Sequence, residues 1–177
     1  MARLAHAYNQ DLFRIVMETN ILTDIDNEAL AREILTEPKR LSDNSFNTQY
    51  EDTFFIPKAN SVGEQFPLFM DENARERGFA VQSKWAHIHQ PLESTNTHNH
   101  IDKAGIVEAS WCYYVATPEG SGLLTFILND YDGSGLQQIK PEAGMLLIFP
   151  HWINHKVTKN MSNDVRISIA GNFKLPV

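Results

Sequence analysis

The sequence predicts a mainly β protein with helices near its N-terminus, and a jelly-roll barrel is the leading candidate for its architecture. From Phe79 onward, six segments are rich in β-branched and aromatic residues and either alternate or run apolar. Clusters of Gly, Pro, Asn and Asp separate most of these segments, as is typical of turns. The preceding residues carry helix signals instead. Short strands that follow one or two helices predict a sandwich or barrel buttressed by helices.

The first predicted element is a helix from about Asn27 to Thr36. Asp24 or Asp26 can cap its N-terminus, and Pro38 marks its exit. Its apolar face consists of Leu30, Ile34 and Leu35. Because apolar residues at this spacing share one side of a helix, we expect the helix to pack against the outside of a sheet.

The stretch from Leu41 to Gly78 is rich in Asn, Ser, Asp and Phe and has mixed patterning. Phe54 to Ile56 is a candidate short strand, and Gln65 to Arg77 can include a second helix. We expect this stretch, together with the rim around Trp152, to shape a substrate pocket.

The predicted strands follow in chain order. They are Ser83 to His89, Glu108 to Thr117, Gly122 to Leu128, Met145 to Phe149, His155 to Thr158 and Arg166 to Phe173. Successive side chains of a strand point to opposite faces, so alternate residues of each segment can face a common interior.

Length and composition restrict the class of protein. A chain of 177 residues suits one domain with a full core, and its single cysteine, Cys112, predicts no internal disulfide and no exposed thiol nucleophile. The formal net charge of −7, without a basic patch, argues against general binding of nucleic-acid backbones. No apolar run approaches the roughly 20 residues that span a bilayer, and residues 1–20 lack the pattern of a signal peptide. We therefore expect a cytoplasmic protein with no membrane partner.

Three residues of the β half form a candidate metal site. His100 and Asp102 lie two residues apart, and His155 opens a later strand whose period turns it inward. Two imidazoles and one carboxylate on one face of a metal leave three positions open, which is how non-haem Fe(II) is held for dioxygen activation. Asn154 or a backbone carbonyl could fix the second nitrogen of His155.

Other histidines leave alternatives open. His98, His100 and Asp102 share period-two spacing, so His98 with His100 could grip the metal, although a carboxylate would give Fe(II) a hard anionic ligand. His151 competes with His155, but it lies in a turn and is expected at the rim. The remaining pair, His87 and His89, shares one strand face and is expected to line a pocket or meet solvent.

Arg166 and Ser168 lie on one face of the last predicted strand, opposite Ile167 and Ile169. An arginine that faces into a barrel needs an anion, and its guanidinium can hold a carboxylate by two hydrogen bonds while a hydroxyl donates a third. The pair therefore predicts an organic dicarboxylate as co-substrate. A surface arginine paired with Asp164 is the alternative.

Taken in order, these motifs resemble the Fe(II)/2-oxoglutarate-dependent oxygenases, and within them the prolyl-hydroxylase-like branch and its small bacterial and phage members. The motifs are His100-x-Asp102, Trp111-Cys-Tyr-Tyr-Val115, Gly122-Leu-Leu-Thr-Phe126, Pro141 to Pro150, Trp152-x-x-His155-x-Val157 and Arg166-Ile-Ser168, within roughly Trp85 to Phe173. The chain departs from the pattern in two places. Some small members carry His-x-His-Pro where this chain continues with Ile101-Asp102, and His151 stands where a small residue is more usual.

The resemblance implies a double-stranded β-helix in which His100, Asp102 and His155 bind Fe(II). It also implies that Arg166 and the Tyr114 hydroxyl bind the distal carboxylate of 2-oxoglutarate. The implied activity is hydroxylation of a C–H bond, such as that of a prolyl or other amino-acid side chain, with decarboxylation of 2-oxoglutarate to succinate and ascorbate as reductant. Dioxygen and a peptide, protein or small-molecule substrate are the implied partners.

One oxygenase domain is then expected over residues 1–177, with a helical buttress and substrate-side loops in 1–80 and the jelly-roll core and metal site in 81–177. The alternative is a cupin-like or lectin-like barrel that binds a metal or ligand without redox chemistry. Arg166 argues against that alternative, because a sugar-binding barrel has no general need for an inward guanidinium.

Overall fold

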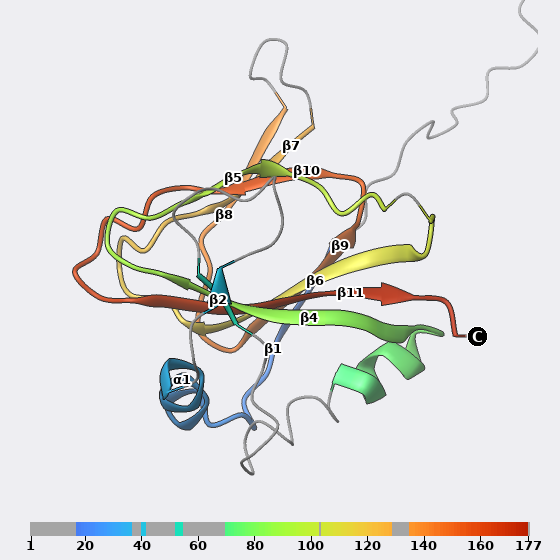
Figure 1. The fold of residues 1–177 in the computed structure, drawn as a ribbon, viewed down its shortest axis with the longest axis horizontal. Coiled ribbons are helices and arrows are strands. Elements are labelled where there is room, and N and C mark those ends of the chain that lie inside the picture. Colours follow the sequence, from blue (N-terminus) through green and yellow to red (C-terminus); the bar gives the residue numbers. More distant parts are fainter. Residues whose placement is uncertain are drawn as a thin grey trace, which may run out of the picture.

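Two antiparallel sheets lie face to face in the computed structural model, which describes residues 17–36, 40–41, 52–54, 70–102, 104–128 and 135–176 (Figure 1). The large sheet has the order β1 (Glu18–Ile21), β9 (Met145–Pro150), β6 (Val107–Ala116), β11 (Arg166–Lys174), β4 (Ala80–His89), β3 (Asp52–Phe54), β2 (Arg40–Leu41). The small sheet has the order β5 (Thr95–His98), β10 (Asn154–Val157), β7 (Leu124–Ile127), β8 (Leu136–Ile139). This is the mainly β jelly-roll that the sequence predicts.

All six predicted strands are present, with ends that differ by up to three residues. Strand β4 begins at Ala80 instead of Ser83, and β7 covers Leu124–Ile127 within the predicted Gly122 to Leu128. Strands β1, β2, β5 and β8 were not among the predicted strands, and β3 overlaps the candidate strand only at Phe54. Three strands from the first eighty residues join the large sheet, so this part of the chain adds strands as well as helical cover.

Helix α1 (Asn27–Thr36) matches the predicted helix. The Asp26 carboxylate accepts a hydrogen bond from the Ala29 backbone N–H at 2.9 Å, so Asp26, and not Asp24, caps the helix. Leu30 and Ile34 are fully buried, whereas Leu35 is 45% exposed. The prediction that Leu35 belongs to the buried face was wrong, because the contact with the sheet covers a narrower stripe of the helix.

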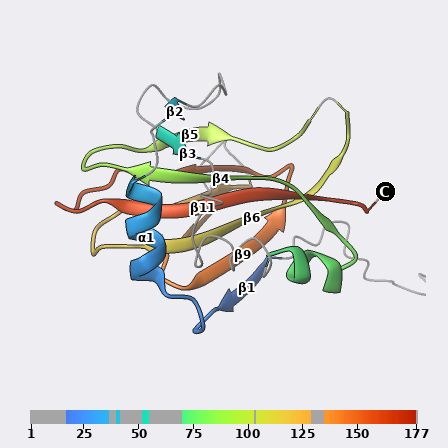
Figure 2. The same cartoon turned by 60° about the horizontal axis from the view of Figure 1, so that its bottom comes forward.

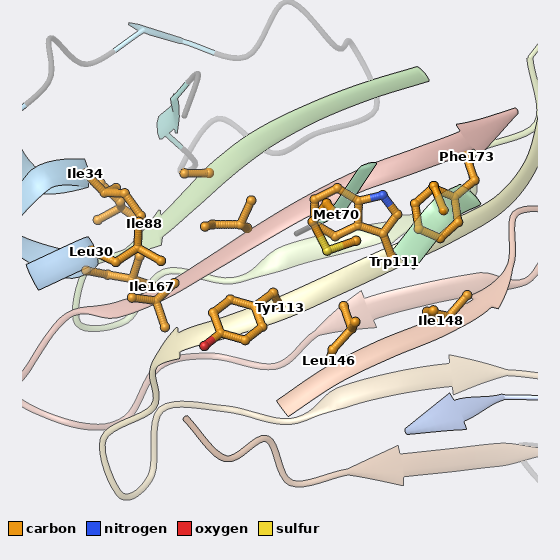
Figure 3. Close-up of a cluster of buried hydrophobic side chains, with 14 residues drawn as sticks. Leu30, Ile34, Met70, Ile88, Trp111, Tyr113, Leu146, Ile148, Ile167 and Phe173 are labelled. Carbon is orange, nitrogen blue, oxygen red and sulfur yellow. The ribbon is translucent and has the colours of Figure 1, made fainter. Parts of the chain in front are cut away.

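The outer face of the large sheet is covered by helices. Leu30 and Ile34 of α1 pack against Ile88 and Ile167 of the sheet, and a second helix at residues 70–76 adds Met70 (Figures 2 and 3). This helix falls inside the predicted Gln65 to Arg77. Pro38 and residues 55–56 and 65–69 of the predictions lie outside the described residues. Within the described parts, no helix is long and apolar enough to cross a membrane.

A second apolar cluster fills the space between the two sheets. Its buried members are Tyr114, Leu124, Phe126, Met145, Leu147, Phe149 and Ile153. Alternation along β11 places Ile167 and Ile169 under the helices and Arg166 and Ser168 between the sheets. Strand β11 therefore presents apolar side chains to the helices and polar side chains to the barrel interior.

Candidate metal and co-substrate site

A cavity of about 40 Å³ lies between the sheets and is lined by residues of both. Among the described residues, its lining includes Arg166 and five histidines but no acidic residue. The five are His87, His89, His98, His100 and His155. A volume of this size holds only about three waters, so side chains of the lining must move apart to admit a larger ligand. The interior is thus a compact, basic pocket with apolar walls.

Three histidines meet at one end of this pocket. One ligand nitrogen from each of His98, His100 and His155 lies within 4.8 Å of the other two. His98 and His155 are directly opposed residues in the pairing of β5 with β10, and their ring centroids are 4.3 Å apart. His100 follows β5, and its Nε2 lies 3.3 Å from Nε2 of His155. The structure therefore brings His100 and His155 together as predicted, with His98 as the third member.

Backbone carbonyls fix the rings of two of these histidines. The Nδ1 atom of His155 lies 3.0 Å from the Ile153 carbonyl oxygen, and that of His98 lies 2.8 Å from the Asn96 carbonyl oxygen. A carbonyl only accepts hydrogen bonds, so each Nδ1 carries the proton and each Nε2 keeps a lone pair. A carbonyl therefore orients His155, which was one of the two predicted possibilities, and both rings present a ligand atom inward.

The imidazoles are also held in the neutral form that a metal requires. Burial lowers the pKa of His100 to about 2, with further lowering from His155 and His98. Burial likewise lowers the pKa of His155 to about 3, with His98 as the next cause. Metal binding at neutral pH would therefore displace no proton from either ring.

Asp102 lies apart from the three histidines. Its Oδ1 accepts a hydrogen bond from the Ile106 backbone N–H at 2.9 Å, and its carbonyl oxygen accepts one from Gly105 N–H at 3.3 Å. Gly105 has a φ of 63°, which glycine adopts without strain. The carboxylate thus closes the turn that leads to β6, and it is absent from the group of side chains that could hold a metal among the described residues.

Arg166 lies at the other end of the pocket and is only 1% exposed. Its Nη1 lies 3.2 Å from Nδ1 of His89, and Nε2 of His89 lies 2.9 Å from the Thr95 hydroxyl. The guanidinium Nε forms no hydrogen bond, and its carbon lies 5.3 Å from the centroid of the Tyr114 ring. A buried arginine with spare donors needs an anion. The alternative of a surface arginine paired with Asp164 is wrong, because Arg166 is buried and forms no ion pair with Asp164.

Tyr114 and Ser168 lie beside the guanidinium. Arg166 lies over the Tyr114 ring, and Ser168 on β11 is directly opposed to Tyr114 on β6. The Tyr114 hydroxyl is buried and makes no hydrogen bond of normal geometry, although Arg166 and the Cys112 thiol are its polar neighbours. Burial raises the pKa of Tyr114 well above its ordinary value, so the group is a neutral donor. Arg166, Tyr114 and Ser168 thus form a cradle with donors for a carboxylate.

The remaining predicted residues surround the pocket. The Trp85 ring stacks on His100 with centroids 5.7 Å apart, and its Nε1–H donates to Nε2 of His87. His87 and His89 both face the pocket, as one of the two expectations for them stated. His151 bonds through Nδ1 to the Glu108 carbonyl and Trp152 is 46% exposed, and neither residue is part of the pocket lining.

Comparison with known proteins identifies the family. The profile of the family described as "Putative 2OG-Fe(II) oxygenase" matches residues 83–172, which is half of the chain and includes every predicted site residue. The chain belongs to this family. Fe(II) and 2-oxoglutarate are the cofactors typical of its members. No curated protein matches the chain.

Solved structures of similar fold include prolyl hydroxylases. A Pseudomonas putida prolyl-4-hydroxylase has a TM-score of 0.68 and 17% identity, with 91% of this chain and 93% of that chain covered. A Trichoplax adhaerens prolyl hydroxylase, in complex with a peptide fragment of hypoxia inducible factor, has a TM-score of 0.69 and 11% identity, with coverage of 91% and 83%.

The same fold also carries chemistry on small molecules. The non-haem alpha ketoglutarate dependent carbocyclase SnoK, from nogalamycin biosynthesis, has a TM-score of 0.68 and 13% identity, with coverage of 90% of this chain and 79% of that chain. These likenesses establish the double-stranded β-helix as the fold of this chain, as the family resemblance implied.

The sequence analysis missed one feature of the site, the contact of Arg166 with His89, and ranked another, the place of His98 among the metal ligands, second. His89 was not recognised as the partner of Arg166, although both residues lie on neighbouring strands and are directly opposed. His98 was ranked below Asp102 because a carboxylate would give Fe(II) a hard anionic ligand. The period-two argument placed both on one side by assuming extended backbone as far as residue 102, whereas β5 ends at His98. Knowledge of strand pairing would have been needed for both.

Proposed function

We propose that this protein is a 2-oxoglutarate-dependent non-haem iron dioxygenase that hydroxylates a C–H bond. In the balanced reaction, substrate, dioxygen and 2-oxoglutarate give hydroxylated substrate, succinate and carbon dioxide. The observation that carries the proposal is the buried Arg166, which has no carboxylate partner among the described residues and lies in the same pocket as three converging histidines. A non-redox sugar-binding or ligand-binding barrel would not require this pair of features.

The three histidines fit a divalent metal, because their nitrogens converge and the imidazoles of His100 and His155 are neutral. His100 and His155 would hold Fe(II), which supplies the chemistry of dioxygen activation when bound. Arg166 would bind the distal carboxylate of 2-oxoglutarate by charge-assisted hydrogen bonds. Tyr114 and Ser168 would donate to the same group.

The apolar wall has a separate role in this proposal. Leu124, Phe149 and Val157 line the pocket beside the histidines. Apolar side chains there would limit the access of water to the metal and strengthen the interaction of Arg166 with its anion. Ascorbate would serve as the reductant that keeps the metal in the Fe(II) state.

The first substrates to test are prolyl peptides, because two of the similar structures are prolyl hydroxylases. Free amino acids form the second set. Anaerobically loaded Fe(II) protein would be incubated with dioxygen, 2-oxoglutarate and ascorbate, with succinate and the gain of one oxygen atom measured by mass spectrometry. Slow succinate formation without substrate would already support the co-substrate assignment.

Arg166→Met tests the proposed co-substrate site directly. Loss of hydrogen bonds to a charged group costs about 3 kcal/mol, so we expect 2-oxoglutarate binding to weaken by about 100-fold. Binding would be measured by calorimetry on protein loaded with Co(II). Arg32→Met, at an exposed ion pair with Glu28, is the matched control and should bind as wild type does. Equal affinity in the two variants would contradict the proposal.

A further inference from the structure

We infer that the metal is held by three imidazoles, those of His98, His100 and His155, and that the carboxylate of Asp102 is not a ligand. The inference rests on the proposed function only in requiring that the pocket binds a divalent metal. It departs from the set of two histidines and one carboxylate that the resemblance implies.

Strand pairing is the first support for this ligand set. His98 and His155 are partners in the antiparallel pair of β5 and β10. Directly opposed residues of such a pair project to the same face with Cβ atoms about 5 Å apart. The two rings can therefore reach one metal without any change in the backbone. Strand β5 ends at His98, so this relation does not extend to Asp102.

Ring orientation is the second support. The backbone carbonyls of Asn96 and Ile153 accept from Nδ1 of His98 and His155, so Nε2 is the nitrogen of each ring that carries the lone pair. Nε2 of His100 lies 3.3 Å from that of His155. Two nitrogens that bind one metal at about 2.1 Å and at right angles would lie about 3.0 Å apart. The histidine separation is thus close to that of adjacent ligands.

The position of the Asp102 carboxylate is the third support. Its Oδ1 accepts the Ile106 backbone N–H at 2.9 Å and shapes the turn before β6. The backbone before it is also anchored, because His100 N–H donates to the His151 carbonyl at 2.8 Å. The Asn99 side chain donates to the Asn154 side chain at 2.9 Å. The carboxylate is absent from the group of described side chains whose ligand atoms converge, so coordination by Asp102 would require it to move towards the histidines.

An all-imidazole site has a distinct charge. Three neutral ligands leave a divalent metal with both of its positive charges, whereas a carboxylate ligand would cancel one. No acidic residue lines the pocket in the part of the chain that the structure describes, and Arg166 adds a further positive charge. The doubly charged anion 2-oxoglutarate would therefore supply the negative charge that the protein does not.

The test compares His98→Gln with Asp102→Asn, which keeps an oxygen for the Ile106 N–H. Anaerobic Co(II) titration would be followed by visible absorption. We expect His98→Gln to lose more than the roughly 10- to 100-fold in affinity that loss of an outer-shell partner costs. Asp102→Asn should bind Co(II) as wild type does. His151→Gln, at the histidine that bonds to the Glu108 carbonyl, is the matched control.

A second measurement counts the ligands. In proton NMR spectra of the Co(II) protein, each bound imidazole gives a strongly shifted N–H signal that disappears in D₂O. The number of these signals should fall by one in His98→Gln and stay unchanged in Asp102→Asn. If His98→Gln does not fold, Asp102→Asn decides alone: wild-type affinity supports the inference, and a large loss overturns it.

The two proposals can fail separately. Metal binding that depends on Asp102 and not on His98 would overturn the three-imidazole centre and leave the oxygenase proposal intact. Metal binding that depends on His98, without any binding of 2-oxoglutarate, would support the ligand set and contradict the proposed activity.

Discussion

The contact between Arg166 and His89 determines how much positive charge the pocket retains. A guanidinium has donors only, so Nδ1 of His89 must accept its hydrogen bond at 3.2 Å. The proton of His89 then lies on Nε2, which donates to the Thr95 hydroxyl at 2.9 Å. His89 is therefore a neutral partner. It positions the guanidinium without cancelling its charge, which an aspartate in the same place would do.

We expect His89→Asp to weaken 2-oxoglutarate binding by about tenfold or more, because an anionic partner would compete with the co-substrate for Arg166. His89→Asn is the matched variant, since its amide oxygen can still accept from Arg166 without adding charge. Calorimetry of 2-oxoglutarate with the Co(II)-loaded variants would measure the difference. Equal affinities in the Asp and Asn variants would rule out a role for charge.

At the scale of elements, sequence patterning located the interior strands and the capped helix but not the edges of the sheets. Strands β4, β6, β9 and β11 are rich in apolar residues because both of their faces are covered. Strands β1, β5 and β8 lie at sheet edges and are largely polar. Edge strands commonly avoid apolar residues, so periodicity gave them little signal.

The partial prediction of the site has the same origin. Arg166, Ser168 and His155 could be oriented from alternation within their own strands, and the structure places all three in the pocket. The partners of these residues depend on register between strands that are far apart in sequence. His155 and His98 are far apart in the sequence, and the pairing of β10 with β5 makes them neighbours in space.

A part-buried polar contact ties helix α1 to β6. The Tyr113 hydroxyl donates to the Asn27 side-chain oxygen at 2.7 Å, at the start of the helix. Burial raises the pKa of Tyr113 to about 12, above its ordinary value of 10. The folded protein therefore keeps this proton at a pH at which the unfolded chain releases it. Stability from this group is complete below about pH 10 and is lost as the pH rises towards 12.

We accordingly expect the free energy of unfolding to fall between about pH 10 and 12, by at most about 1.4 kcal/mol per pH unit for one such group. Urea denaturation at several pH values would measure the slope. Tyr113→Phe removes the titrating hydroxyl and should reduce the slope by its share. An unchanged slope in this variant would show that Tyr113 is not the source.

At the scale of the whole molecule, the proposed metal and co-substrate sites lie on different sheets. Two of the converging histidines lie on β5 and β10 of the small sheet, and the third lies in the loop after β5. Arg166, Ser168 and Tyr114 belong to the large sheet. A ligand that reaches from the metal to Arg166 would join the two layers of the barrel.

This arrangement predicts that Co(II) and 2-oxoglutarate together raise the melting temperature more than the sum of their separate effects. A ligand at 100 times its Kd stabilises the folded state by about 2.7 kcal/mol. Differential scanning calorimetry with each ligand alone and with both would measure the increments. Arg166→Met should retain the increment from Co(II) and lose the added one. Purely additive increments in the wild type would contradict the bridging geometry.

The stacking of Trp85 on His100 also gives the protein an optical reporter. The indole lies 5.7 Å from a ring that faces the metal position, measured between centroids. A transition metal bound there should quench the fluorescence of Trp85 most strongly. Trp111 also lines the pocket but packs on Phe173 instead of on a proposed ligand, and Trp152 is 46% exposed. Trp85→Phe should remove most of the quenching seen on addition of Co(II), and retention of the full signal would place the metal elsewhere. Metal loading can thus be followed in real time by intrinsic emission, before any substrate is known.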